Sequence, residues 1–199
     1  MAIPEDPRRN PRVRVREVEV LSDSWYTLRR VTFDFQGRDG QWTMQRREVY
    51  DRGNGVTIQL RDTTRDTVLL TRQFRMPAYL NGHPDGMLLE APAGLLDDGD
   101  ADAETAIRRE AEEETGYRVG SVRRLGEYFM SPGSVTERIA FFTGSYRAGE
   151  RVSQGGGVAS EGEDIEVVEV TLAEAIAMVE RGEIVDAKTV LLLRLAQFA

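Results

Sequence analysis

The sequence contains no cysteine and only one histidine among its 199 residues. The absence of cysteine excludes disulfides, cysteine zinc sites, iron–sulfur clusters and thiol catalysis. The single histidine, His83, excludes a site built from several histidines and gives little support to a histidine-based triad. It lies in a polar loop, residues 81–85, which we interpret as surface. Any chemistry must therefore rest on carboxylates, arginines, backbone groups and, where a metal takes part, one that prefers oxygen ligands.

Long apolar runs are also missing from the sequence. No segment approaches the roughly 18 apolar residues of a membrane span. The first 15 residues combine prolines, acids and arginines without the apolar stretch of a secretory signal. We therefore expect a protein of the cytoplasm that does not enter a membrane.

The charge balance is acidic, with a formal net charge of −8 and a pI near 4.9. This balance argues against a general nucleic-acid binder, which needs a basic surface. A small anionic substrate remains compatible, because a divalent cation can bridge protein carboxylates and phosphate. Residues 1–47 carry ten arginines against seven acids, which leaves −11 for the remainder. This segment is either a subdomain that packs on an acidic surface or a solvated strand face.

Hydropathy alternation predicts an N-terminal antiparallel β region after a frayed arm, residues 1–12. Val13, Val15, Val18 and Val20 alternate with polar residues, with a phase slip near Glu17 that indicates a β-bulge. Residues 25–35 and 41–50 form a predicted hairpin around the turn at residues 38–40.

The rest of the chain mixes short strands with helices. Further strands are predicted at residues 56–60, 67–72, 87–90, 125–130, 139–146 and 166–170. Thr171 and Glu174 form a capping box for a helix over residues 172–180, and Asp186 is placed to cap a second over residues 188–197. Many short strands with two or three helices predict an α+β fold with a mixed sheet.

Residues 93–117 are the most informative segment. Asp100 or Asp102 is placed to cap a helix that runs to Thr115 and ends at Gly116. On a helical wheel, Glu110 and Glu114 fall in the middle of the apolar face and Glu113 falls at its edge. The other members of this face are Ala103, Ala106, Ile107 and Ala111, whereas Arg108 and Glu112 point away.

Glutamates on a buried face repel one another and resist ionisation, so they need a compensating charge. Arg109 and Arg75 are one source of that charge. A hard divalent cation such as Mg²⁺ or Mn²⁺, which prefers oxygen ligands, is the other. The alternative of a purely structural, solvated acidic helix does not explain why Glu110 and Glu114 share the apolar face.

The segment from Arg109 to Tyr117, with the sequence REAEEETGY, resembles the second half of the Nudix box. Pro92-Ala93-Gly94 precedes it, as in that family. The first half departs from the pattern: Asp100 stands where glutamate is usual, and eight residues instead of seven separate it from Arg109.

The similarity continues outside the box and covers nearly the whole chain after residue 15. The flanking segments look like the GDP-mannose hydrolase branch of the ADP-ribose pyrophosphatase-like Nudix hydrolases. They are residues 47–55, 72–75, 128–133, 155–158, 163–166 and 186–190. The resemblance implies a mixed β-sheet sandwiched between helices. It also implies an N-terminal β subdomain for dimerisation at residues 1–47, a Nudix domain at residues 48–199, and a homodimer.

The resemblance implies a role for each matched residue. The carbonyl of Ala93 with Glu110, Glu114 and Glu163 would bind Mg²⁺, for which Mn²⁺ could substitute. Glu163, Glu113 and Arg109 would serve catalysis, Glu163 as base or metal ligand on a lid at residues 153–163 that is poorly ordered until substrate binds. A flexible linker is the alternative interpretation of that glycine-rich loop. The implied substrate-binding residues are Asp51, Arg75, Glu137 and Lys188.

The implied reaction is Mg²⁺-dependent cleavage of the diphosphate bond of a nucleoside diphosphate sugar. GDP-mannose would give GMP and mannose 1-phosphate, and the alternative substrate, ADP-ribose, would give AMP and ribose 5-phosphate. A catalytically silent, nucleotide-binding regulator is a second alternative. Arg109 as a surface ion pair and Lys188, the only lysine, as a solvated side chain are the corresponding structural alternatives.

Overall fold

The computed structural model describes residues 10–97 and 99–196. Residues 1–9 of the arm expected at residues 1–12 and the predicted helix end at Gln197 lie outside the described residues. The chain divides into two compact units. The first holds the chain up to Gly53 together with Ser131–Glu137, and the second holds Asn54–Met130 and Arg138–Ala199.

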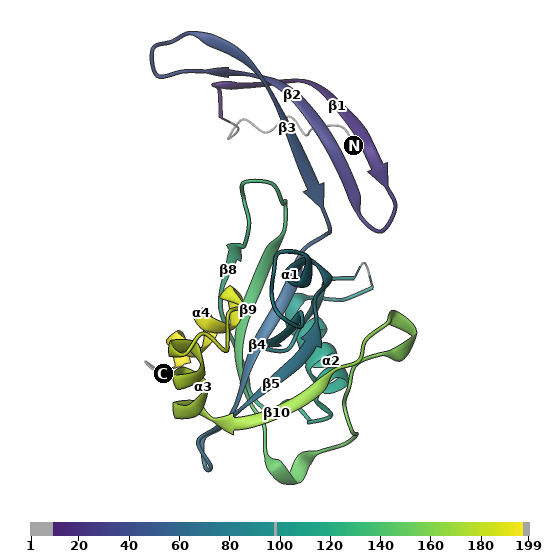
Figure 1. Ribbon diagram of the computed structural model, residues 1–199, viewed down its shortest axis with the longest axis vertical. Helices are drawn as coiled ribbons and strands as arrows, with labels where there is room; N and C mark the ends of the chain where they lie inside the picture. Colours follow the sequence, from purple (N-terminus) through teal and green to yellow (C-terminus); the bar gives the residue numbers. More distant parts are fainter. Residues whose placement is uncertain (1–9, 98, 197–199) are drawn as a thin grey trace. The chain divides into compact units, whose positions relative to one another are not determined.

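The first unit is a three-stranded antiparallel sheet (Figure 1). Strands β1 (Val13–Asp23), β2 (Thr27–Gln36) and β3 (Trp42–Asp51) are joined by tight turns in the order β1-β2-β3. The register shifts between Val15 and Glu17, which confirms the predicted bulge. Because of this shift, the four valines of β1 pair with alternate residues of β2, Phe35, Phe33, Val31 and Arg29, and so share one face of the sheet.

The second unit is a mixed sheet between two layers of helix, which confirms the predicted α+β class (Figure 1). Its order is β10-β5-β4-β9-β8, with β6 paired to β5 and β7 paired to β4. Only the β4–β9 pair is parallel among the described strand pairs. The strands are β4 (Gly55–Asp62), β5 (Thr67–Phe74), β6 (Met87–Glu90), β7 (Ala93–Leu95), β8 (Val122–Phe129), β9 (Arg138–Ser145) and β10 (Glu166–Thr171).

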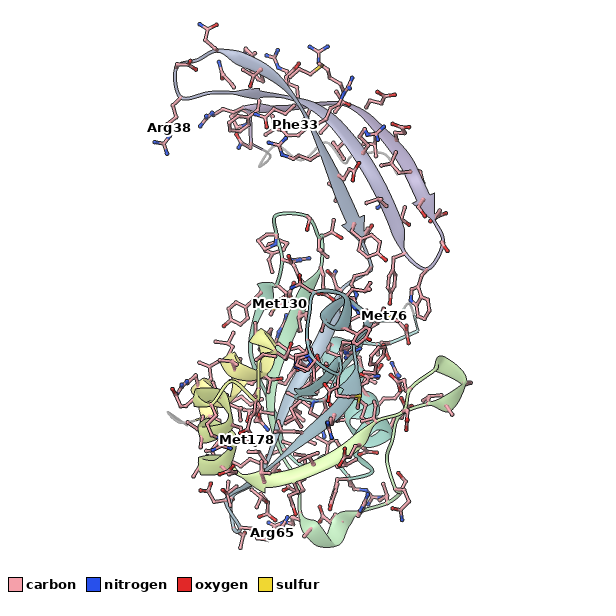
Figure 2. All side chains as sticks on the ribbon, viewed as in Figure 1. Phe33, Arg38, Arg65, Met76, Met130 and Met178 are labelled. Carbon is pink, nitrogen blue, oxygen red and sulfur yellow. The ribbon has the colours of Figure 1, made fainter. Side chains whose placement is uncertain are left out.

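Helices cover both faces of this sheet, and strand β4 is therefore buried on both sides. On one face, α2 (Ala103–Thr115) buries Ala106, Ile107 and Ala111 against Val56 and Ile58. On the other, α3 (Leu172–Glu180) and α4 (Ala187–Ala196) pack on β5, with Met178 of α3 against this second core (Figure 2). The remaining helices are α1 (Met76–Leu80), η1 (Ala148–Glu150) and η2 (Ala159–Glu161).

Several elements differ from the sequence-based prediction, among them the short helices η1 and η2, which were not predicted. Strand β8 begins at Val122, three residues before the predicted start at residue 125. The prediction missed its first residues because a bulge between Arg124 and Gly126 interrupts the alternation of apolar and polar residues. Helix α1 and strand β7 were not predicted, since five and three residues are too short for a periodic pattern. Throughout the described chain, no helix combines the length and apolarity needed to cross a membrane.

Candidate active site

Helix α2 is positioned by its two caps. Asp102 is the N-cap, and its Oδ1 accepts a hydrogen bond from the Thr105 N–H at 2.8 Å. Of the two candidate caps, the structure thus selects Asp102 over Asp100. Gly116 ends the helix with φ of 75° and donates its N–H to the Glu112 carbonyl. The apolar side of α2 faces the sheet, and Glu110 and Glu114 turn toward it as predicted.

Glu114 and Glu110 meet strand β7 directly. Glu114 is 3% exposed, and its Oε2 accepts a hydrogen bond from the Ala93 N–H at 3.2 Å. Glu110 lies so close to Gly94 that a Cβ on the glycine would be 2.0 Å from Cδ of the glutamate. The β7–β4 pairing, in which Gly94 lies opposite Val56, holds this backbone under the helix. The backbone of Ala93 and Gly94 therefore lies directly against the side chains of Glu114 and Glu110.

Burial makes both carboxylates hard to ionise. It raises the pKa of Glu110 to about 7, a shift that Arg109 opposes and the charges of Glu113 and Glu163 reinforce. Burial also raises the pKa of Glu114 well above its usual value, and the charges of Glu163 and Glu110 act in the same direction. Glu110 is thus repelled by Glu113 and Glu163, and Glu114 by Glu110 and Glu163.

Arg109 is the cation nearest to these acids. Its Nη1 lies 3.0 Å from Oε1 of Glu110 and 3.2 Å from Oε2 of Glu113. Its Nη2 lies 3.4 Å from Oδ2 of Asp100, whose side chain is 10% exposed. Asp100 therefore reaches Arg109 despite the extra residue between them, a role that the spacing of the sequence did not predict. Arg109 holds two carboxylates of the site, while its catalytic role stays a prediction.

Glu163 is held by its own loop. Its Oε2 accepts a hydrogen bond from the Val158 N–H at 2.8 Å. The glycines that precede it bond to the last turn of α2: Gly156 N–H donates to the Glu114 carbonyl and Gly157 N–H to the Glu113 carbonyl. These hydrogen bonds attach the first half of the loop to the helix that carries the glutamates. That the loop is poorly ordered until substrate binds stays a prediction.

A buried ion-pair network surrounds Arg75 and Lys188. Glu90 is only 4% exposed. Its carboxylate accepts hydrogen bonds from Nε and Nη2 of Arg75 at 2.9 and 2.6 Å and from Nζ of Lys188 at 2.9 Å. Lys188 also lies 3.0 Å from Asp186, so the alternative of a solvated lysine is wrong. Burial alone would raise the pKa of Glu90, but the two cations outweigh it and the net pKa is lowered. The charge of Glu114 also acts on Arg75, which links this network to the carboxylate site.

Three members of this network were missed at the sequence level. Besides Glu90, they are Asp186 as a lysine partner and Thr189, whose hydroxyl donates to Asp186 and accepts the Ala91 N–H, both at 2.6 Å. Glu90 could have been predicted, because it is the acidic last residue of an otherwise apolar strand. A buried acid there needs a cationic partner, since burying an unpaired charge is costly.

Asp51 and Glu137 both lie in the first unit. Asp51 accepts hydrogen bonds from Arg29 at 2.6 Å and from the Thr136 hydroxyl at 2.9 Å. Glu137, 8% exposed, is 3.4 Å from Nη1 of Arg52. Each carboxylate is therefore neutralised within its own unit, and the substrate-binding roles of both residues stay predictions.

The donor set of the site fits a hard divalent cation. It consists of carboxylate oxygens that are buried and mutually repelling, which is the situation a cation relieves. Within residues 10–97 and 99–196, however, no three acidic or histidine side chains already form a metal-binding group. The hydrogen bonds of Glu114 to Ala93 and of Glu163 to Val158 occupy oxygens that metal binding would draw away.

Family models divide the chain near the boundary of its two units. The model of the NUDIX domain matches residues 51–193. The chain belongs to the NUDIX domain family. Its members are hydrolases that generally need a divalent metal. A second model, the GDP-mannose pyrophosphatase NudK N-terminal domain, matches residues 12–50.

Curated relatives are similar over almost their full length. A GDP-mannose pyrophosphatase of Salmonella arizonae is 54% identical over 88% of this chain and 90% of its own. The protein of the same name from Yersinia enterocolitica is 55% identical over 90% of this chain and 92% of its own. A crystal structure described as an ADP compounds hydrolase superposes with a TM-score of 0.73, covering 96% of this chain and 95% of that one. At 20% identity this last likeness concerns the fold alone.

Proposed function

We propose that this protein hydrolyses GDP-mannose to GMP and mannose 1-phosphate. The observation that carries the proposal is the 54% identity, over 88% of the chain, to a GDP-mannose pyrophosphatase. The intact group of Glu110, Glu113, Glu114 and Glu163 supports an enzyme over a silent nucleotide-binding regulator, which has no need of a buried Glu114 beside other carboxylates. ADP-ribose, hydrolysed to AMP and ribose 5-phosphate, is the alternative substrate that the test must separate.

We infer that Glu110, Glu114, Glu163 and the carbonyl of Ala93 bind Mg²⁺, with Mn²⁺ able to replace it. The bound cation would neutralise the diphosphate and lower the pKa of the attacking water. Arg109 would keep Glu110 and Glu113 oriented through charge-assisted hydrogen bonds. Glu163 or Glu113 would accept the proton of the water as its oxygen bonds to one phosphorus and the bond between the bridging oxygen and that phosphorus breaks.

Arg75 and Lys188 are the cations that we assign to the substrate. Arg75 has 39% of its side chain exposed while its Nε and Nη2 are held by Glu90, so its outer edge is free to face a phosphate. We also assign Asp51 and Glu137 to the substrate, and we place the boundary between the N-terminal subdomain and the Nudix domain at residue 47. We also propose that the protein is located in the cytoplasm.

We further propose that the protein is a homodimer formed through the N-terminal sheet. Val13, Val15, Val18 and Val20 are 37–56% exposed, although all four share one sheet face with Phe33 and Phe35. Phe33 is labelled on this sheet in Figure 2. A three-stranded sheet that leaves its apolar face uncovered gains little stability alone. A second copy of the chain would bury these valines.

The deciding experiment is a panel of GDP-mannose, ADP-ribose and UDP-glucose with Mg²⁺ and, in parallel, Mn²⁺. We expect the highest kcat/KM for GDP-mannose, with GMP and mannose 1-phosphate as products in equal amounts. A higher kcat/KM for ADP-ribose would overturn the substrate assignment and leave the reaction class intact. Failure to release a nucleoside monophosphate from any of the three would favour the silent regulator.

A further inference from the structure

The backbone of residues 155–157 runs directly along the end of helix α2. Gly156 N–H donates to the Glu114 carbonyl at 2.8 Å and Gly157 N–H to the Glu113 carbonyl at 3.2 Å. Helix ends leave such carbonyls without a partner inside the helix. A Cβ on Gly155 would lie 2.6 Å from the Glu114 carbonyl oxygen, so a side chain there would separate the two backbones. The loop is thus aligned on the same two residues whose carboxylates enter the site.

Gly157 makes a second close approach, to the side chain of Glu163. A Cβ on Gly157 would lie 2.3 Å from Oε2 and 2.9 Å from Cβ of Glu163. That same Oε2 accepts the Val158 N–H at 2.8 Å. The volume that a side chain at position 157 would occupy is therefore filled mainly by Glu163, with Cδ1 of Ile165 at 3.0 Å as the next neighbour.

The far end of the loop is also fixed. Ile165, 7% exposed, donates its N–H to the Gly156 carbonyl at 3.2 Å. The loop that carries Glu163 is closed at its base by this hydrogen bond. The charge of Glu163 acts on both Glu110 and Glu114, which places its carboxylate within electrostatic reach of the helix glutamates.

We propose that Gly157 is a positioning residue that makes the space in which Glu163 is docked ready for metal and substrate. The third glycine of the run Gly155-Gly156-Gly157 acts by leaving room for a carboxylate, not by making a lid flexible. Glu163 would give up its hydrogen bond from the Val158 N–H when a cation binds. The part of this inference that concerns turnover rests on the proposed function, whereas the docking of Glu163 does not.

Gly162 provides a matched control in the same loop. Gly157 has φ of +77° and Gly162 has φ of +78°, so alanine brings a similar backbone strain at either position. A Cβ on Gly162 meets no atom within 4 Å, whereas a Cβ on Gly157 meets Glu163. A difference between Gly157→Ala and Gly162→Ala therefore reports the contacts of the new Cβ with Glu163 and Ile165 and not the strain, and a Glu163→Ala background separates the two contacts.

The first test is thermal unfolding in EDTA, which needs neither metal nor activity. We expect Gly157→Ala to lower Tm by at least about 3 °C more than Gly162→Ala. In a Glu163→Ala background this excess should fall to half or less, because the closest contact, with the carboxylate, is gone and only those with Cβ of residue 163 and Cδ1 of Ile165 remain. An equal loss for the two glycine variants, or an excess that Glu163→Ala leaves unchanged, would overturn the proposal.

The second test follows Mn²⁺ binding by calorimetry and then turnover. We expect Gly157→Ala to bind Mn²⁺ about 10-fold or more weakly than Gly162→Ala, with kcat about 10–100-fold lower and KM within about 3-fold. In a Glu163→Gln background Gly157→Ala should cost nothing further; losses that multiply would contradict an action through Glu163. If the wild type hydrolyses no nucleotide sugar, the proposed function fails, and the unfolding and Mn²⁺ measurements still decide the role of Gly157.

Discussion

The side chain of Glu110 lies directly against the backbone of Gly94. A Cβ at position 94 would be 2.0 Å from Cδ and 2.4 Å from Oε1 of the glutamate. Glycine is therefore required by the carboxylate that passes over it, and strand β7 and helix α2 approach each other only because of it. The first glycine of the Nudix box and its central glutamate form one packing contact.

Gly94→Ala should therefore impair the site through this contact alone. The new methyl group forces Glu110 out of place, so we expect a loss of about 1–3 kcal/mol in the free energy of unfolding. We also expect kcat to fall by about 10-fold or more. Urea unfolding and steady-state kinetics measure the two effects. Gly99→Ala, where a Cβ meets nothing within 4 Å, is the control and should be nearly silent.

Glu110→Gln and Glu114→Gln should each lower turnover by orders of magnitude while the fold survives. Each removes a charge that we assign to the metal, and several kcal/mol of transition-state stabilisation depend on that charge. In EDTA, both variants should melt at or above the wild-type Tm, because a repelling buried carboxylate has been removed.

The control for these two variants is Glu112→Gln on the same helix. Glu112 accepts the Val119 N–H at 3.1 Å, a hydrogen bond that the amide oxygen of glutamine also accepts. It should keep wild-type kcat. An unchanged kcat in Glu110→Gln or Glu114→Gln would remove that residue from the proposed metal site.

The sequence was sufficient for the helix that carries the glutamates, because a 3.6-residue period fixes which side of α2 is buried. Glu110 and Glu114 were predicted to face inward for this reason. The same argument does not apply to Asp100, because this residue lies before the helix begins. The turn that precedes the helix brings its carboxylate to Arg109, and helical periodicity does not predict the path of a turn. Strand β1 followed the same logic, since the phase slip of its valines located the bulge.

Contacts between elements distant in sequence were not accessible to pattern reasoning. Glu90 and Lys188 are 98 positions apart and meet only because β6 and α4 pack together. The docking of Gly156 and Gly157 on α2 depends in the same way on the path of a loop, for which composition suggested only flexibility. Periodicity orients a side chain within its own element, whereas its partner on another element follows from tertiary packing.

The stability of the metal-free protein should fall as the pH rises from 5 to 8. The pKa of Glu110 in the folded protein is about 7, above the usual value of about 4.3 in an unfolded chain. Between these values the folded protein holds a proton that the unfolded chain has released, so the free energy of unfolding decreases with increasing pH. The raised pKa of Glu114 acts in the same direction.

Urea unfolding in EDTA at pH 5, 6, 7 and 8 measures this dependence. Glu110→Gln should flatten it, since the variant has no proton to lose at that position. Saturating Mg²⁺ should reverse it, because the cation competes with protons for the folded carboxylates. A free energy of unfolding that increases steadily from pH 5 to 8 in EDTA would contradict the buried, protonated state of these glutamates.

Lys188→Met should destabilise the fold in addition to any effect on substrate. The substitution leaves Glu90 and Asp186 without one of their cations, and removing one partner of a buried ion pair typically costs about 3–5 kcal/mol. Arg75 still compensates Glu90, so we expect the lower end of this range in urea unfolding. Arg123→Met, at an exposed arginine, is the control. A raised KM with an unchanged free energy of unfolding would assign Lys188 to substrate alone.

The proposed dimer should depend on the valine face of β1. Val18 and Val20 are 41% and 56% exposed, and Val18→Lys would place a charge where we expect a second copy to pack. Light scattering should give a dimer for the wild type and a monomer with reduced activity for Val18→Lys. Glu17→Lys adds the same group to the same strand on the opposite face, since Glu17 lies opposite Thr32, and should remain dimeric. A wild-type monomer of full activity, or two variants that behave alike, would exclude this face as the dimer interface.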